Sequence, residues 1–319
     1  MHGTVRNPED KKKNAHLFEL KNASTHLKLF KGELDTEGAF DEPVKGNLPI
    51  HLFSRVKISC ESKIFKGAYG VIHVASPYFY VANDPEKEII QPAIAGVKNI
   101  TKSIDKNETV KVTILTSSGL AMFMSPKPPG HVFSEEDWSD VEMMKKIGQN
   151  YGISKTLAEK VFWEWAETKK DKVRSVSVAP SLVSGPPLQA DPNTSNNNFL
   201  SMLDGSKQKV PNSPIALVDV RDAALAHVLA LEKQVEGRIF AVAKGTTFLD
   251  VANFFRKEFP ERLALIPNEP DLKEGEQLKQ PMLVNNAKAI SLGIEFIDIE
   301  QSLREMVEQV IQKGFLKKI

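Results

Sequence analysis

Cysteine is almost absent from this chain of 319 residues, which contains Cys60 and no other. A single cysteine cannot form an internal disulfide bond, and no N-terminal segment resembles a signal peptide. We therefore expect a reducing, cytoplasmic location. Long apolar runs are absent as well, since none approaches the roughly 18 residues that cross a bilayer. The sequence predicts a protein without a membrane span.

An excess of charge of either sign is also lacking. Lysine and arginine number 42, aspartate and glutamate number 41, and the formal net charge is +1. The dense basic cluster at residues 11–13 is too small to indicate a nucleic-acid surface or a polybasic membrane anchor. We expect small-molecule partners, no bound metal, and a monomer or a homodimer.

What is present is the composition of a globular protein, with 41% hydrophobic and 26% charged residues. Four short apolar runs alternate with helical patterns, which is typical of a parallel sheet covered by helices. The runs lack polar alternation, as strands buried on both faces do. The predicted strands span residues 70–75, 110–116, 173–179 and 239–243, and the predicted helices span residues 83–104, 152–170, 219–233 and 299–314.

Local signals mark the ends of two of these helices. Asp84 followed by Pro85 is a good start for a helix, because an aspartate accepts hydrogen bonds from free N–H groups and proline needs none. Pro92 requires a kink or a break in the same helix. Gly314 fits the position directly after the last helix.

The clearest chemical pattern is "YGISK", residues 151–155. Side chains four residues apart share one face of a helix, so the Lys155 ammonium can favour the ionised form of the Tyr151 phenol. A serine at the end of the preceding strand, in "TSS", could then hold a substrate carbonyl. The alternative is a solvated lysine beside a packed tyrosine, since the spacing alone is a weak signal.

A collinear set of motifs over nearly the whole chain resembles the extended short-chain dehydrogenase/reductase superfamily. Within it, the motifs are most similar to the branch of dihydroflavonol reductases, cinnamoyl-CoA reductases and fungal methylglyoxal or aldehyde reductases. The motifs are "HVASP" (73–77), "LTSSG" (115–119), "EEDWSD" (135–140), "YGISKTLAEK" (151–160), "APSLVSGP" (179–186) and "VDVRDAALAHVLALE" (218–232).

This resemblance implies an α/β fold, namely a Rossmann-type doubly wound parallel sheet with a smaller C-terminal substrate lobe. It implies NADP as the cofactor and the reduction of a ketone or aldehyde, a small-molecule carbonyl substrate, to an alcohol. The dinucleotide-binding domain would comprise residues 1–180 and 214–245. The substrate lobe would comprise residues 181–213 and 246–319.

The resemblance also assigns catalytic roles by position. Tyr151 would be the general acid, and Lys155 would bind the nicotinamide ribose and tune Tyr151. Ser118 would orient the substrate carbonyl, with Ser117 as the neighbouring alternative. Asp219, Asp222 and His227 are interpreted as helix-capping and packing residues.

Further positions would bind the cofactor. Arg6 would hold the adenosine 2′-phosphate, assisted by Lys13, and an arginine rather than an acid at this strand end favours NADP over NAD. For the lysine cluster considered alone, a solvated basic turn is the alternative. The other cofactor-binding positions implied by the family are Glu33 near the adenine, Ala75, Ser76, Tyr151, Lys155 and Pro180.

Two departures from the family bear on whether the chain can hold the cofactor. The first strand of the family and its G-x-x-G-x-x-G turn, which holds the pyrophosphate, have no counterpart before Arg6 or elsewhere. Residues 47–69 form an atypical insertion, in which "HLFSRVKIS" has enough β character to occupy the place of the first strand. The alternative function is therefore a catalytically silent or incomplete homologue that cannot hold the cofactor.

Overall fold

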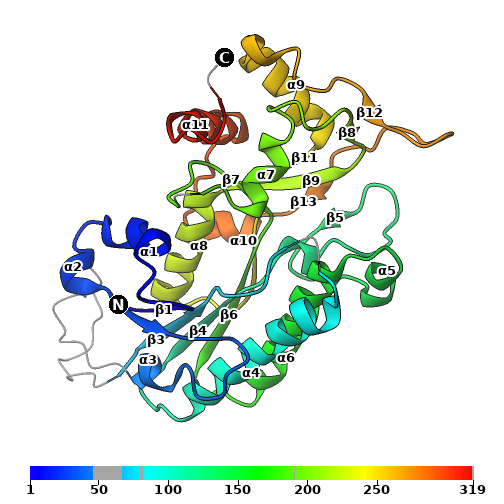
Figure 1. Ribbon diagram of the computed structural model, residues 1–319. Coiled ribbons are helices and arrows are strands. Elements are labelled where there is room, and N and C mark those ends of the chain that lie inside the picture. The colour runs from blue at the N-terminus through cyan, green and yellow to red at the C-terminus, as the bar shows by residue number, and fades with distance from the viewer. Residues whose placement is uncertain (46–66, 80–81, 190, 318–319) are drawn as a thin grey trace. The chain divides into compact units, whose positions relative to one another are not determined.

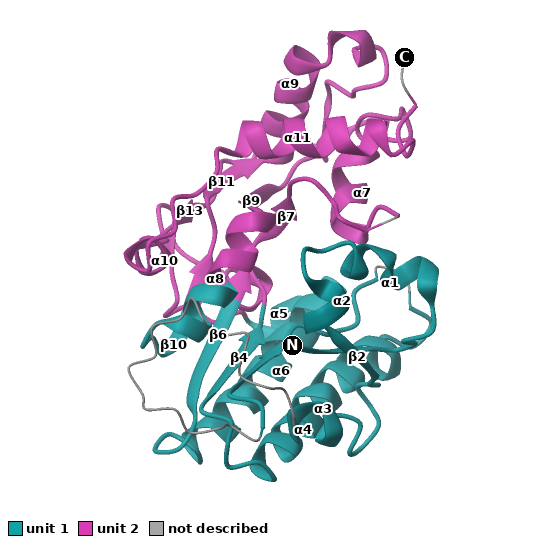
Figure 2. Ribbon diagram, turned by 90° about the vertical axis from the view of Figure 1, so that its left-hand side faces the viewer, with its two compact units in different colours: residues 1–117, 140–178, 227–238 teal, residues 118–139, 179–226, 239–319 magenta. Residues whose placement is uncertain are grey.

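A computed structural model describes residues 1–45, 67–79, 82–189 and 191–317 (Figure 1). The predicted insertion at residues 47–69, with its "HLFSRVKIS" segment, lies outside the described residues except for its last three positions. By contacts the chain divides into two compact units (Figure 2). Unit 1 comprises Met1–Ser117, Asp140–Val178 and His227–Arg238, and unit 2 comprises Ser118–Ser139, Ala179–Ala226 and Ile239–Ile319. The functional domains predicted from the sequence have different boundaries and stay a prediction.

The four strands predicted from the sequence form one four-stranded sheet. Its order is β10 (Gly237–Ala241), β6 (Arg174–Pro180), β4 (Val112–Thr116) and β3 (Gly70–His73). β4 runs parallel to both β3 and β6, with Val112 opposite Gly70 on one side and opposite Arg174 on the other. Ile114 is fully buried, as the absence of polar alternation predicts. The prediction of an α/β fold with a parallel sheet is confirmed.

In unit 1, helices α4 (Gln91–Asp105) and α6 (Asn150–Glu167) pack together on one face of this sheet (Figure 1). A buried cluster joins them to β4 and consists of Ala93, Val97, Leu115, Ala158 and Phe162. Because side chains alternate along a strand, Thr116 faces the opposite side, where its hydroxyl lies 2.7 Å from Nε2 of His227. His227 belongs to α8 (Val220–Glu232), so both faces of β4 carry a helix.

The sequence predicted a kink or a break at Pro92, and the helix does change its geometry just before this residue. A π-helical turn, Glu86–Ile90, runs directly into α4, with the Gln91 N–H bonded to the Glu86 oxygen, and Pro92 is the second residue of α4. Asp84 accepts a hydrogen bond from the Lys87 N–H at 3.2 Å, as its predicted capping role requires. The wide turn thus accommodates the proline without ending the helix.

The N-terminal strands pair only with each other among the described residues. β1 (His2–Val5) runs parallel to β2 (Lys28–Lys31) in a sheet of two strands, and β3 is the edge of the four-stranded sheet. On and just after β3, Ile72 and Val74 are 39% and 60% exposed. The N-terminal segment is joined to α4 instead, through the buried residues Phe40, Val44, Ile100 and Ile104. The other helices of unit 1 are α1 (Lys11–Phe18), α2 (Ala23–His26), α3 (Asp41–Lys45) and α5 (Val141–Lys146).

Unit 2 contains a second sheet, in which β9 (Pro214–Asp219) pairs parallel with β7 (Leu182–Ser184) and antiparallel with β11 (Lys244–Thr247). Its core is built by α9 (Phe248–Glu258), α11 (Ile299–Gln312) and this sheet. Gly314 has a φ of +78° directly after α11, which confirms its predicted place. The remaining elements are Gly119–Ala121, β5 (Val132–Phe133), α7 (Thr194–Leu200), β8 (Val210–Pro211), Pro260–Arg262, β12 (Pro270–Asp271), β13 (Leu283–Val284) and α10 (Ala287–Ser291).

Asp219 and Asp222, which the sequence analysis interpreted as capping and packing residues, have these roles in unit 2. Asp219 is fully buried and accepts hydrogen bonds from Arg221 at 2.8 Å and from the Ser302 hydroxyl at 2.6 Å. Asp222 accepts one from the Ile297 N–H at 2.8 Å. Within the described parts of the chain, no helix is both long and apolar enough to cross a membrane.

Candidate active site

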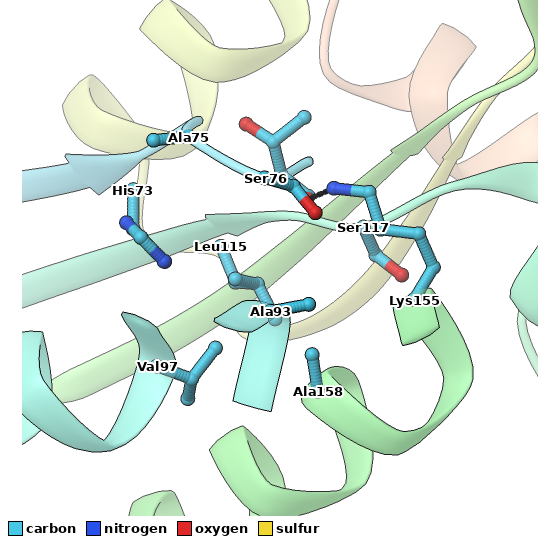
Figure 3. A pocket seen from close by; sticks show the side chains of 10 residues that line it. His73, Ala75, Ser76, Ala93, Val97, Leu115, Ser117, Lys155 and Ala158 are labelled. Atoms are coloured by element: carbon cyan, nitrogen blue, oxygen red, sulfur yellow. Dashed lines mark hydrogen bonds between the residues drawn. The ribbon is translucent and has the colours of Figure 1, made fainter. Parts of the chain in front are cut away.

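A cavity opens in unit 1 at the carboxyl ends of β3 and β4, the edge at which parallel sheets of this kind bind ligands (Figure 3). Four elements, namely β3, β4, α4 and α6, and the loop after β3 surround it. Its apolar wall comes from α4, Leu115 and Ala158. Its lining residues are His73, Ala75, Ser76, Ala93, Val97, Leu115, Thr116, Ser117, Lys155 and Ala158. The predicted residues Ala75, Ser76 and Lys155 are thus brought together.

Lys155 extends from α6 into this cavity and is only 5% exposed (Figure 3). Its Nζ donates a hydrogen bond to the main-chain oxygen of Thr116 at 2.8 Å. Burial lowers the pKa of Lys155 to about 8, because an ammonium loses its hydration, and the charge of Glu159 opposes this shift. The solvated lysine that the sequence left as an alternative is therefore excluded.

Tyr151 lies one helical turn before Lys155 and is half-buried. The Lys155 Nζ lies 5.9 Å from the centroid of the Tyr151 ring. The ring of Tyr78, from the loop after β3, packs against Tyr151 with 4.4 Å between centroids. Sequence reasoning missed Tyr78, since an aromatic residue in a loop carries no signal of its partner.

His73, the last residue of β3, is buried beside Lys155. Burial lowers the pKa of His73 to about 4, and the positive charge of Lys155 lowers it further in the same direction. The imidazole is therefore neutral at pH 7. Nearby, the buried Oγ of Ser76 has no hydrogen-bond partner among the described residues, which leaves it available to a ligand in this cavity.

The two serines that the sequence could not separate have different surroundings. Ser117 is 3% exposed, and its hydroxyl donates to Oε2 of Glu159 at 2.6 Å. Ser118, the first residue of unit 2, is half-buried and extended, and its Oγ accepts a hydrogen bond from the Leu120 N–H at 3.2 Å. Because Ser117 is committed to Glu159, Ser118 is the better candidate for a ligand contact.

The residues predicted to bind the adenosine end are found in the N-terminal segment and do not line the cavity. Arg6 is exposed directly after β1. Lys13 lies in α1, with its Nζ 3.9 Å from Asp10, and Glu33 follows β2 and forms an ion pair with Lys31 at 3.0 Å. Pro180 is the last residue of β6 and belongs to unit 2.

Sequence reasoning also missed Glu159, which is fully buried below the cavity and paired with Arg238. Its spacing of four residues from Lys155 on a helix was a signal that places both side chains on one face. The spacing could not show that this face is buried against the sheet.

Known proteins are similar in sequence to this chain over most of its length. The pattern described as the NAD dependent epimerase/dehydratase family matches residues 53–243. Cinnamoyl-CoA reductase CAD2 of Medicago truncatula is 35% identical over 315 residues, which cover 98% of this chain and 88% of that protein. Anthocyanidin reductase of Arabidopsis thaliana is 33% identical over 331 residues, with the same two coverages.

Solved structures of reductases share the fold. The yeast methylglyoxal/isovaleraldehyde reductase, crystallised with NADPH, has a TM-score of 0.79 and 25% identity, covering 98% of this chain and 92% of that one. Vestitone reductase of alfalfa (Medicago sativa) has a TM-score of 0.76 and 25% identity, covering 99% and 91%. The likeness in structure thus extends across both units.

Proposed function

This chain belongs to the NAD dependent epimerase/dehydratase family, and from that membership we propose that it is an NADPH-dependent oxidoreductase that reduces a ketone or aldehyde to an alcohol. The relatives named above are reductases, and one of them was crystallised with NADPH. The observation that carries the proposal is the buried Lys155 one helical turn from Tyr151, beside a cavity at the ends of parallel strands. This geometry suits a carbonyl group that must receive a proton.

In this proposal Tyr151 is the general acid. A tyrosine of ordinary pKa, about 10, is a poor proton donor and acceptor near neutral pH. The Lys155 ammonium, 5.9 Å from the ring, favours the phenolate and so brings the phenol closer to the working pH. Ser118 orients the substrate carbonyl, and NADPH, when bound, supplies the hydride. Because His73 is neutral, the positive charge among the residues that line the cavity is that of Lys155.

The described residues fit such a cofactor in part. The orphaned Ser76 hydroxyl and the Lys155 ammonium are suited to the hydroxyl groups of a ribose. We propose that Arg6 and Lys13 bind the 2′-phosphate, because a guanidinium pairs with a phosphate in two parallel hydrogen bonds. Glu33, Ala75, Lys155 and Pro180 complete the proposed set.

Replacement of Tyr151 by phenylalanine tests the general acid. We expect Tyr151→Phe to abolish reduction of an aldehyde panel, because the ring keeps its packing against Tyr78 and only the proton donor is lost. The melting temperature should stay near the wild-type value. Tyr69→Phe, before β3, is the matched control and should keep its activity. A Tyr151→Phe variant with wild-type kcat/KM would refute the assignment.

A catalytically silent homologue is the second candidate function, and one observation favours it. Among the described strands, β3 is an edge strand, and Ile72 and Val74 are exposed where a parallel sheet of this class is normally covered. A chain that is incomplete at this edge would keep Tyr151 and Lys155 and still bind NADPH poorly. Titration of the intact protein with NADPH, followed by cofactor fluorescence, separates the two. Saturable binding at micromolar concentration supports the enzyme, and no binding at millimolar concentration supports the silent homologue.

A further inference from the structure

Glu159 is a completely buried carboxylate, one helical turn after Lys155. Both of its oxygens are saturated by hydrogen bonds from protein groups. The Ser117 hydroxyl donates to Oε2 at 2.6 Å, and the Ser177 hydroxyl donates to Oε1 at 2.6 Å. The Arg238 guanidinium donates to Oε1 at 2.8 Å and to Oε2 at 3.1 Å, and the Trp163 Nε1 donates to Oε1 at 3.3 Å.

Apart from Trp163, which lies on α6 itself, these donors come from three neighbouring strands of one sheet or the residue directly after one. Ser177 lies in β6, Arg238 lies in β10, and Ser117 directly follows β4. One side chain of α6 is therefore bonded to all three. A buried ion pair is a poor source of stability, since apolar residues of similar volume often serve as well or better. The arrangement ties β4, β6 and β10 to the helix that bears Tyr151 and Lys155.

Glu159 and Arg238 also determine the charge around Lys155. Tyr151 and Glu159 face it from its own helix, and His73 faces it from β3 in the neutral form. The lining residues from α4 and β4, which are Ala93, Val97, Leu115 and Thr116, are uncharged. Arg238 lies behind Glu159 and neutralises part of its charge.

We propose that Glu159 is a positioning residue of this site, which holds Ser117 at the end of β4 and sets the charge around Lys155 without touching substrate or cofactor. The inference rests on the proposed function in that Tyr151, Lys155 and Ser118 are taken as the reaction centre. Its first test therefore uses no activity at all.

The first test measures the titration of Lys155 in the free protein, by carbon-13 NMR with the lysine Cε atoms labelled. Lys155 should titrate well below the ordinary lysine pKa of about 10.4, and Lys155→Met assigns its signal by removing it. Glu159→Gln removes the negative charge and leaves Arg238 unpaired, so the midpoint of Lys155 should fall by about one pH unit.

Glu167→Gln is the matched control, because it makes the same change on an exposed turn of the same helix and should leave the midpoint in place. The double variant Glu159→Gln/Arg238→Gln leaves no unpaired charge, and its midpoint should fall between those of Glu159→Gln and the wild type. It also serves where Glu159→Gln alone fails to fold. Midpoints equal to that of Glu167→Gln would overturn the electrostatic part of the proposal.

The second test compares two serines that bond the same carboxylate at the same distance. Ser117→Ala removes the bond that holds residue 117 to Glu159, next to Ser118. It should lower kcat about tenfold, because a small misplacement of Ser118 is costly for the reaction. Ser177→Ala removes a bond to the other oxygen from within β6 and leaves Ser117 bonded to Glu159, so its kcat should stay within about twofold of the wild type. Equal effects of the two variants would overturn the positioning role.

Failure of this inference differs from failure of the proposed function. If the wild-type protein is inactive but Glu159→Gln still shifts the titration midpoint of Lys155, the proposed function is wrong and the electrostatic role of Glu159 stands. If the wild-type protein is active, and replacing Glu159 changes neither its activity nor the titration midpoint of Lys155, the inference is wrong and the proposed function stands.

Discussion

The Nζ atom of Lys155 lies 2.8 Å from the main-chain oxygen of Thr116, in a cavity where burial lowers the pKa of this lysine to about 8. A single neutral hydrogen bond offsets only part of the hydration that a buried ammonium loses. Lys155 therefore destabilises the folded protein in its charged form. Costs of this kind are concentrated at functional sites, where stability is exchanged for activity.

Lys155→Met should make the protein more stable at pH 7 and abolish reduction. Burial lowers the pKa of Lys155 from 10.5 to about 8, which corresponds to at most about 3 kcal/mol. The wild-type penalty is complete below pH 8 and fades as the pH rises to 10.5, where the unfolded state also releases its proton. The gain in melting temperature should thus be largest at pH 7 and small at pH 10.5. The surface variant Lys160→Met should show no such gain, and a lower melting temperature for Lys155→Met at pH 7 would contradict the argument.

His73 should make the stability of the protein sensitive to acid. Burial and the nearby charge of Lys155 lower the pKa of His73 from 6.5 to about 4. Between pH 6.5 and 4 the unfolded state binds the proton and the folded state does not, so stability falls as the pH falls through this window. The loss approaches about 3 kcal/mol at pH 4. His73→Gln should flatten the melting temperature across this range relative to His16→Gln, which alters a histidine outside the cavity. Equal pH dependence of the two variants would show that His73 is not the group responsible.

The sequence was sufficient to predict the strands of the main sheet and the helix of the site. The four apolar runs form one sheet because strands buried on both faces need apolar residues throughout, and this need is visible in the chain itself. The "YGISK" pattern places Tyr151 and Lys155 on one face of a helix because helical spacing is local. Both predictions depend on neighbours in sequence.

The sequence was insufficient where the partner is distant in sequence. Ser117 and Ser118 differ in surroundings because Glu159, 42 positions after Ser117, accepts a hydrogen bond from the Ser117 hydroxyl. The packing of Tyr78 on Tyr151 likewise brings together residues of two separate segments. Side-chain partners of this kind follow from the folded chain and leave no periodic signal.

The edge of the main sheet gives a prediction from two isoleucines that are directly paired. Ile72 of β3 lies opposite Ile114 of β4, yet Ile72 is 39% exposed and Ile114 is fully buried. Ile114→Ala should destabilise the protein by about 2–5 kcal/mol, because it removes buried methyl groups and leaves a cavity. Ile72→Ala should cost about 1 kcal/mol or less, since part of its side chain already contacts water. Chemical denaturation measures both variants, and equal losses would mean that another segment or molecule covers β3.

Arg6 provides the test of cofactor choice. Its guanidinium is exposed directly after β1, with room to form two charge-assisted hydrogen bonds to a phosphate. Each such bond is worth about 1.5–3 kcal/mol, which is about 10- to 100-fold in affinity, so Arg6→Ala should weaken NADPH binding at least about tenfold and more if both bonds form. NADH lacks the 2′-phosphate and should bind both proteins equally. Lys12→Ala removes a positive charge from the same exposed segment and should change NADPH affinity by no more than about twofold. Isothermal titration with both cofactors measures these constants. An equal loss for NADPH and NADH would mean that Arg6 supports the adenine end through folding and does not contact the 2′-phosphate.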